Sequence, residues 1–147
     1  MPGLNHFDQL ILLLQIFQLL ATTDEVILLN DRPALNKSFE KAEKRMDSIY
    51  QYIQANYRGK PDVNAIAKQV NLTTAAFCRF FKKHTKMTFT DFINQFRINQ
   101  AKNYLLQDKS ISEATYEVGF ESISYFNKVF KKLVGENPGS FKKRYVH

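Results

Sequence analysis

The sequence has one cysteine, no tryptophan, and only five glycines and four prolines among its 147 residues. A single cysteine, Cys78, excludes an intrachain disulfide and fits a reducing compartment such as the cytoplasm. The scarcity of glycine and proline, without an alternation of β-branched residues, favours an all-α fold over a sheet architecture. No basic start followed by an apolar core and a small-residue cleavage site indicates a secretion signal.

Long hydrophobic runs are also missing. The most apolar stretch, Leu10–Leu20 (LILLLQIFQLL), is interrupted by two glutamines and is shorter than the roughly 20 residues that span a bilayer. We therefore expect no membrane segment. Within Leu4–Leu29, apolar residues recur at helical spacing on both sides of the predicted helix. Such a helix packs on the rest of this chain, on a domain outside the sequence, or on a second copy.

The residue patterns of enzymes and metal sites do not occur either. His6, His84 and His147 are isolated from one another, without the spacing of metal ligands. There is no glycine-rich phosphate loop, nucleophile motif or paired-carboxylate motif. We expect no catalytic residue, no metal and no cofactor. Cys78 has basic neighbours that would favour its thiolate, but burial or contact with DNA is a better interpretation than a redox sensor.

Positive charge is present and unevenly placed. The net charge is +7, and residues 1–60 hold equal numbers of acidic and basic residues, so the whole excess lies in residues 61–147. A localised positive field attracts nucleic-acid phosphates or anionic lipid headgroups.

The chain divides into an N-terminal helical segment (residues 1–31), a linker (residues 32–45) and a helical module (residues 46–147). The sequence Asp31-Arg32-Pro33 breaks the first pattern, and the residues that follow are short of large apolar side chains, which indicates a linker with a charged, partly helical end. Capping residues and apolar periodicity then predict helices in the module. These helices cover residues 46–57, 63–70, 74–84, 88 or 90 to 106, 111–118, 122–134 and 140–144.

One short motif occurs twice in the module. Residues 77–83 read FCRFFKK, and residues 126–132 read FNKVFKK. Each lies in the second helix of a short helix, a tight turn and a second helix, at residues 62–84 and 110–134. This is the outline of a helix-turn-helix (HTH) unit, whose second helix enters the major groove of DNA.

The spacing within the motif suggests a role for each residue. The first and fifth residues are phenylalanines one helical turn apart, which would bury against the first helix. Cys78 and Arg79, and likewise Asn127 and Lys128, then point outward, where arginine can contact guanine and asparagine adenine. Lys82 and Lys131 follow, near flanking phosphates. The long helix between the units, about 27 Å, would set the two second helices roughly one DNA turn apart.

The segment ISEATYEVGFESISYFNKVFKKLVGENPGSFKKR, from Ile111 to Arg144, resembles the signature of the AraC/XylS-type transcription regulators. The match includes Val118-Gly119-Phe120, Phe130-Lys131 and Pro138. The earlier copy, IAKQVNLTTAAFCRFFKK, is similar to the less uniform first HTH of that family. The resemblance extends over about 100 residues.

This resemblance implies an all-α domain with two HTH units joined by a long helix, which binds double-stranded DNA and regulates transcription, more often as an activator. It also implies RNA polymerase as a partner, and a preceding effector-binding and dimerising domain of which Leu4–Leu29 would be the end, giving a homodimer. The base-reading positions it implies are Ala75, Cys78, Arg79, Ile123, Ser124, Asn127 and Lys128. The backbone-contacting positions it implies are Thr73, Lys82, Lys83, Lys131 and Lys132.

The sequence departs from the family pattern at three places. Ala114 and Thr115 stand where a larger aliphatic residue and an alanine are usual, so we expect looser packing there. Lys86 replaces a common glycine after the first reading helix, so we expect a different turn. Ala75 and Ala76 are small where longer side chains often read bases, which leaves the first helix's specificity to Arg79, Cys78 and contacts with thymine methyl groups.

Two other kinds of protein fit parts of the sequence. One is a helical interaction module that acts through Leu4–Leu29 without specific DNA binding. The other is a basic amphipathic protein on a membrane surface, which would bind anionic vesicles. Binding of duplex DNA with a preferred sequence and a steep salt dependence would favour the regulator over both.

Overall fold

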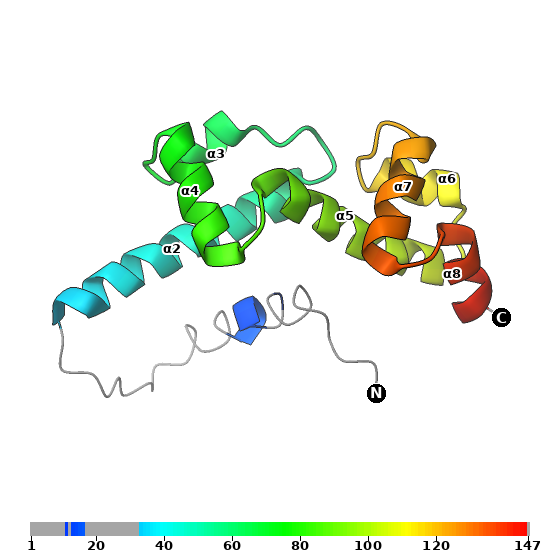
Figure 1. The fold of residues 1–147 in the computed structure, drawn as a ribbon, viewed down its shortest axis with the longest axis horizontal. Coiled ribbons are helices and arrows are strands. Elements are labelled where there is room, and N and C mark those ends of the chain that lie inside the picture. The colour runs from blue at the N-terminus through cyan, green and yellow to red at the C-terminus, as the bar shows by residue number, and fades with distance from the viewer. Residues whose placement is uncertain (1–10, 12, 17–32, 147) are drawn as a thin grey trace. The chain divides into compact units, whose positions relative to one another are not determined.

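The computed structural model describes residues 11, 13–16 and 33–146, and the regular elements in this part of the chain are all α-helices (Figure 1). The all-α fold class is therefore confirmed. The chain divides into two units, Met1–Lys44 and Arg45–His147. The helices are α2 (Pro33–Asn56), α3 (Val63–Gln69), α4 (Thr74–Thr85), α5 (Phe89–Leu106), α6 (Ile111–Glu117), α7 (Ile123–Val134) and α8 (Pro138–Tyr145).

Little of the N-terminal segment can be compared with its prediction. Residues 11 and 13–16 are helical, and the side chains of Leu13 and Ile16 are exposed. The rest of Leu4–Leu29, for which we predicted a dimerisation helix, lies outside the described residues.

A continuous helix occupies the segment that the sequence indicated as a linker. Helix α2 begins at Pro33, covers most of residues 32–45 and runs on to Asn56. Proline is favourable at the first position of a helix, where its missing N–H has no helical partner. The helix is therefore longer than the partly helical end that we predicted for the linker. Residues 37–41 are exposed, and helix formation does not require a buried face at every turn.

The first HTH unit consists of α3 and α4. Asp62 caps α3 by accepting from the Asn64 backbone N–H (2.8 Å), and Thr73 caps α4 by accepting from that of Ala76 (3.2 Å). Both caps satisfy backbone donors that the first turn of a helix leaves unpaired. Phe77 and Phe81, the first and fifth residues of the first motif, are fully buried and stack with their ring centroids 5.8 Å apart.

Helix α5 connects the two HTH units and contributes residues to the core of each. Thr88 caps it, as one of the two predicted alternatives required. Near its start, Phe92 packs edge-to-face on Phe81 of α4 at 5.3 Å. Its later residues Ile98, Ala101 and Leu105 are completely buried in the second core, with α6, α7 and α8. The helix is thus fixed at both ends by apolar packing, and its 18 residues give a length of about 27 Å.

The second HTH unit consists of α6 and α7, with α8 packed against them. Ser110 and Glu113 form a reciprocal capping box at the start of α6. Phe126 and Phe130 of the second motif are fully buried, as predicted, and their ring centroids lie 5.5 Å apart. Helix α8 starts earlier than we predicted because Asn137 caps it, accepting from the Ser140 N–H at 2.8 Å, and Pro138 begins it.

The departures from the family pattern at Ala114-Thr115 and at Lys86 are both accommodated in the two-HTH fold. Ala114 and Thr115 are completely buried, and the Thr115 hydroxyl donates to the Ile111 carbonyl (2.7 Å), so that the polar atom has a partner inside the core. Lys86 ends α4 in the left-handed conformation (φ +61°), and Gly135 ends α7 in the same way (φ +88°). The expectation of a different turn at Lys86 was therefore wrong: the lysine adopts the conformation that favours glycine.

Candidate nucleic-acid interface

The side chains predicted to read bases are all exposed, and they lie on α4 and α7, which we call the reading helices. Because the paired phenylalanines hold the opposite side of each reading helix in its core, the polar side of each is free. On α4 these positions are Ala75, Cys78 and Arg79, and on α7 they are Ile123, Ser124, Asn127 and Lys128.

The positions predicted to contact the DNA backbone are exposed as well. Thr73 is the N-cap of α4, so its side-chain oxygen already accepts a hydrogen bond from within the protein. Lys82 and Lys83 lie in the last turn of α4, and Lys131 and Lys132 in the last turn of α7. At such positions cations also interact favourably with the negative end of the helix dipole.

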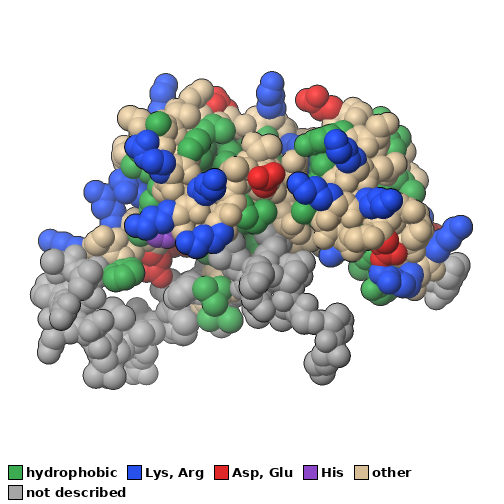
Figure 2. Space-filling model, viewed as in Figure 1, with side chains coloured by type: hydrophobic (Ala, Val, Ile, Leu, Met, Phe, Trp, Pro, Cys, Tyr) green, Lys and Arg blue, Asp and Glu red, His purple; other side chains and the backbone are tan. Residues whose placement is uncertain are grey.

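The electrostatic surroundings of α4 reflect this concentration of lysines. Burial, together with the charges of Lys83 and Lys86, lowers the pKa of His84 below its usual value of 6.5. The imidazole is therefore less readily protonated than a free histidine. Figure 2 shows Lys and Arg side chains over both HTH units on the face that Figure 1 presents, whereas Asp and Glu side chains are scattered singly.

An arginine that the sequence did not single out connects α5 to the turn after α2 and to the second HTH unit. The Arg97 Nε donates to the Tyr57 carbonyl (2.7 Å) and its Nη2 to the Gly59 carbonyl (2.6 Å). Its guanidinium also lies over the ring of Phe120, 5.5 Å from the centroid. Burial lowers the pKa of Arg97. Helix α5 is thereby tied both to the turn after α2 and to the turn of the second HTH unit.

One signal in the sequence could have identified Arg97. It lies between Phe96 and Ile98, two buried residues of α5. A charged side chain between buried positions is rarely without a partner, because burying an unpaired charge is costly. Its partners are backbone carbonyls distant in sequence, and residue patterns do not indicate those.

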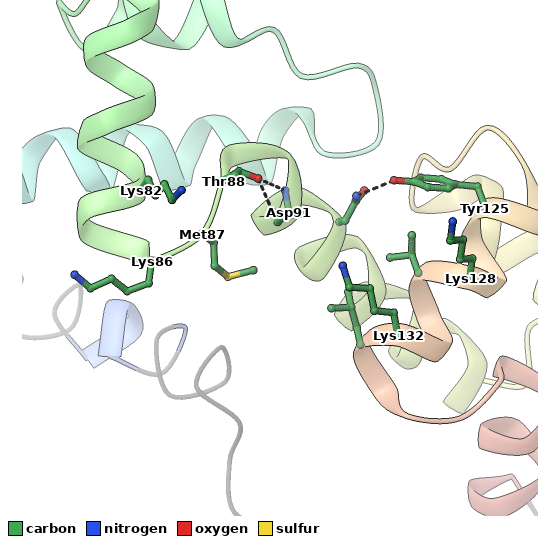
Figure 3. Close-up of a pocket in the computed structure, with 11 residues that line it drawn as sticks. Lys82, Lys86, Met87, Thr88, Asp91, Tyr125, Lys128 and Lys132 are labelled. Atoms are coloured by element: carbon green, nitrogen blue, oxygen red, sulfur yellow. Dashed lines mark hydrogen bonds between the residues drawn. The ribbon is translucent and has the colours of Figure 1, made fainter.

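An open cleft of about 520 Å³ lies between the reading helices. Lys82 and Lys86 line it from α4 and its C-cap, and Lys128 and Lys132 line it from α7 (Figure 3). We call this cleft, after its four lysines, the lysine cleft. Lys128 is a predicted base-reading position, and Lys82 lies about one helical turn after Arg79. The cleft therefore adjoins the predicted base-reading side of both helices.

A hydrogen bond crosses from α5 to the second reading helix at the edge of this cleft. The Asn94 Nδ2 donates to the hydroxyl of Tyr125 (3.2 Å). Both residues line the lysine cleft and also a second cleft, on the side of Arg97 and Phe120. Neither Tyr125 nor Asn94 was among the predicted site residues.

The described residues contain no group of His, Cys, Asp or Glu that could hold a metal ion. Cys78 is exposed and free. No helix in the described part of the chain is long and apolar enough to cross a bilayer.

Comparison with known sequences places these features in a family. Residues 66–144 match the family described as "Helix-turn-helix domain", a range that covers the first HTH unit from Ile66 onward and the whole of the second. A relative from Pseudoalteromonas carrageenovora, named as an uncharacterised HTH-type transcriptional regulator, is 37% identical over 94 residues, or 64% of this chain and 56% of that protein. This chain spans about half the length of the curated relatives it matches.

Solved structures share the fold. A transcriptional regulator from Chromobacterium violaceum with an AraC-type DNA-binding domain superposes with a TM-score of 0.66 at 20% identity, covering 72% of this chain and 96% of that one. The DNA-binding domain of AdpA, solved with a target DNA, superposes with a TM-score of 0.63 at 20% identity, covering 69% of this chain and 91% of that one.

Proposed function

Because this chain belongs to the AraC-type family of helix-turn-helix regulators, we propose that it binds double-stranded DNA at specific sequences and regulates transcription. The observation that carries this proposal is the pair of reading helices, whose polar sides are exposed while their paired phenylalanines are buried. Each helix would enter one of two successive segments of the major groove, as the second helix of an HTH unit does.

Base recognition would depend on few side chains. On α4, Arg79 would donate two of its N–H groups to guanine, and Ala75 and Cys78 would pack on thymine methyl groups. On α7, Asn127 would contact adenine, with Ser124, Ile123 and Lys128 at neighbouring bases. The lysines in the last turns of both helices and the exposed backbone near Thr73 would contact phosphates and position the protein.

We further propose that the regulator is an activator that works in the cytoplasm, without an enzymatic activity. RNA polymerase and a second copy of the chain would be its protein partners, with Leu4–Leu29 as the dimerisation segment. The exposed Leu13 and Ile16 support an apolar contact surface in that segment. The same surface is what an interaction module without specific DNA binding would use.

Selection of bound duplexes from a random pool tests the proposal. We expect enrichment of one sequence with two conserved parts, their centres roughly 10 base pairs apart. Affinity for that sequence should fall steeply with salt, as it does when cations on a protein displace counterions from phosphates. Recovery of unrelated sequences, with weak or salt-independent binding, would favour the interaction module. Sedimentation of the chain with anionic vesicles in place of DNA would favour a membrane-surface protein.

A further inference from the structure

We propose that the lysine cleft is a binding site for the sugar–phosphate backbone of the DNA between the two major-groove segments. This inference rests on the proposed function, in which Lys82, Lys128 and Lys132 already contact DNA, and adds to it Lys86 and the phosphates between the two major-groove segments. Lys86 was not among the residues predicted to contact DNA. The four lysines come from both reading helices, and so DNA that occupies both must pass near the cleft (Figure 3).

The charges in the cleft are largely uncompensated. The two ion pairs within the described part of the chain, Lys142 with Asp108 and Arg144 with Glu136, lie elsewhere. Asp91 is the one carboxylate among the lining residues, and it accepts a hydrogen bond from the Thr88 hydroxyl at the start of α5 (2.7 Å). Four ammonium groups and one carboxylate leave an excess of positive charge, to which a phosphodiester chain is complementary.

The shape of the cleft suits a chain of phosphates better than a compact ligand. It is open, and Met87, Val129 and Leu133 supply apolar lining between the charged groups. The lysines stand at its two sides, while Thr88 and Asp91 lie between them (Figure 3). Flexible ammonium groups on both sides can neutralise successive phosphates without fixing their geometry, and such contacts carry no sequence information.

Lys86 gives the cleft a residue that the fold does not require. Its left-handed backbone is unfavourable for any side chain with a Cβ, and glycine occupies the equivalent position at the end of α7. A residue held in such a conformation is a candidate for function. Here the side chain adds a fourth cation to the cleft, opposite the lysines of α7.

The first experiment measures affinity against salt for the full chain on the duplex that it selects from a random pool. Lys86→Ala with Lys132→Ala should weaken binding about tenfold at low salt and lower the log–log salt slope by about 2, with base preference unchanged. Lys109→Ala with Lys143→Ala removes the same charge away from the cleft and should leave both quantities near the wild-type values. Equal losses in the two double variants would overturn the site, because the general positive field would then explain binding.

The second experiment replaces phosphates on the DNA. Neutral methylphosphonates placed between the two conserved parts of the duplex should weaken wild-type binding. They should have little further effect on the Lys86→Ala, Lys132→Ala variant, because the contacts are already lost. Additive losses would show that these lysines do not contact those phosphates, and would overturn the inference.

A single substitution separates binding from folding. Lys86→Gly removes the cation and also the unfavourable backbone, so it should raise Tm by about 3 °C while weakening DNA binding severalfold. Unchanged affinity would count against the site. If the wild-type chain bound all duplexes alike, the sequence-specific function would fail. The salt slopes measured on an arbitrary duplex would then still decide whether the cleft binds phosphates.

Discussion

Gly119 lies directly against the backbone of Arg58, since a methyl group on Gly119 would stand 2.7 Å from the Arg58 carbonyl carbon and closer still to its oxygen. Gly119 belongs to the turn of the second HTH unit, and Arg58 follows α2. The Arg58 Nη2 in turn donates to the hydroxyl of Tyr104 on α5 (2.9 Å). The second HTH unit is therefore seated on the end of α2 through a backbone contact that has no room for a side chain.

Replacing Gly119 tests this contact. Gly119→Ala should lower the free energy of unfolding by about 3 kcal/mol or more, because a positive φ of +90° becomes unfavourable and the new Cβ collides with backbone atoms. Urea denaturation measures the loss. Gly135→Ala is the matched control, since its φ is +88° with nothing within 4 Å of the added atom, and it should cost only about 1 kcal/mol. Similar losses in the two variants would mean that the Arg58 contact is unimportant.

A second prediction concerns Arg97, which ties α5 to the turn after α2 and to Phe120. Arg97→Lys keeps the charge but loses the planar guanidinium, which donates from two separate nitrogens to the Tyr57 and Gly59 carbonyls while it lies over the Phe120 ring. We expect a loss of about 1–3 kcal/mol in the free energy of unfolding. We also expect a weaker preference for the natural spacing of the two conserved DNA parts.

The spacing preference is measured on duplexes in which those parts are moved one or two base pairs apart. One base pair turns the second part by about 34°, so a rigid protein should bind the altered duplexes poorly. The Arg97→Lys variant should discriminate less between the spacings. Arg144→Lys, at the exposed end of α8, is the control. A destabilised Arg97→Lys variant with wild-type spacing preference would limit the role of Arg97 to folding.

The helices of the two HTH units could be predicted from sequence because their signals are local. Thr73 and Ser110 are followed at helical spacing by apolar residues, and the structure starts α4 and α6 where these caps indicate. Burial of the paired phenylalanines followed from the same periodicity. The N-terminal half of α2 carried little apolar signal, so this stretch was interpreted as a linker with only a partly helical end.

For the candidate site, too, some features could be predicted from the sequence and others could not. Exposure of Cys78, Arg79, Asn127 and Lys128 follows from burial of the paired phenylalanines, so a motif of seven residues was enough to anticipate it. The other base-reading positions, Ala75, Ile123 and Ser124, were predicted from the family resemblance. The lysine cleft and the Arg97 contacts depend on how α4, α5 and α7 meet. Asn94 and Tyr125, for example, are 31 residues apart and meet through one hydrogen bond. Such pairs have no signature in a single sequence.

A third prediction concerns acid stability. Lys142 donates to Asp108 (2.7 Å) and lowers the pKa of that carboxyl below its usual 3.8. A pKa that is lower in the folded state gives stability that is present above the unfolded value and lost as pH falls through the folded value. Asp108→Asn should therefore be less stable than wild type at pH 7, and the difference should vanish below the lowered pKa.

Urea denaturation at pH 7 and in the acid range measures this difference. Asparagine is a suitable replacement because Asp108 has a φ of +63°, which asparagine also tolerates, so the comparison isolates the charge. Lys142→Met should remove the same pH dependence, since the pair has then lost its cation. A difference between Asp108→Asn and wild type that stays constant with pH would show that the ion pair contributes nothing.

The last prediction separates residues that read bases from residues that contact phosphates. Arg79 and Lys131 are both exposed on reading helices, so replacing either should leave Tm nearly unchanged. Arg79→Ala should cost about 1–3 kcal/mol on the preferred duplex and relax the preference at one base pair. Lys131→Ala should weaken all duplexes alike and lower the salt slope by about 1. Affinities for a set of duplexes with single base-pair changes, measured at several salt concentrations, distinguish the two. If both variants lost affinity uniformly, Arg79 would be a phosphate contact and the base recognition of α4 would have to come from its other exposed positions.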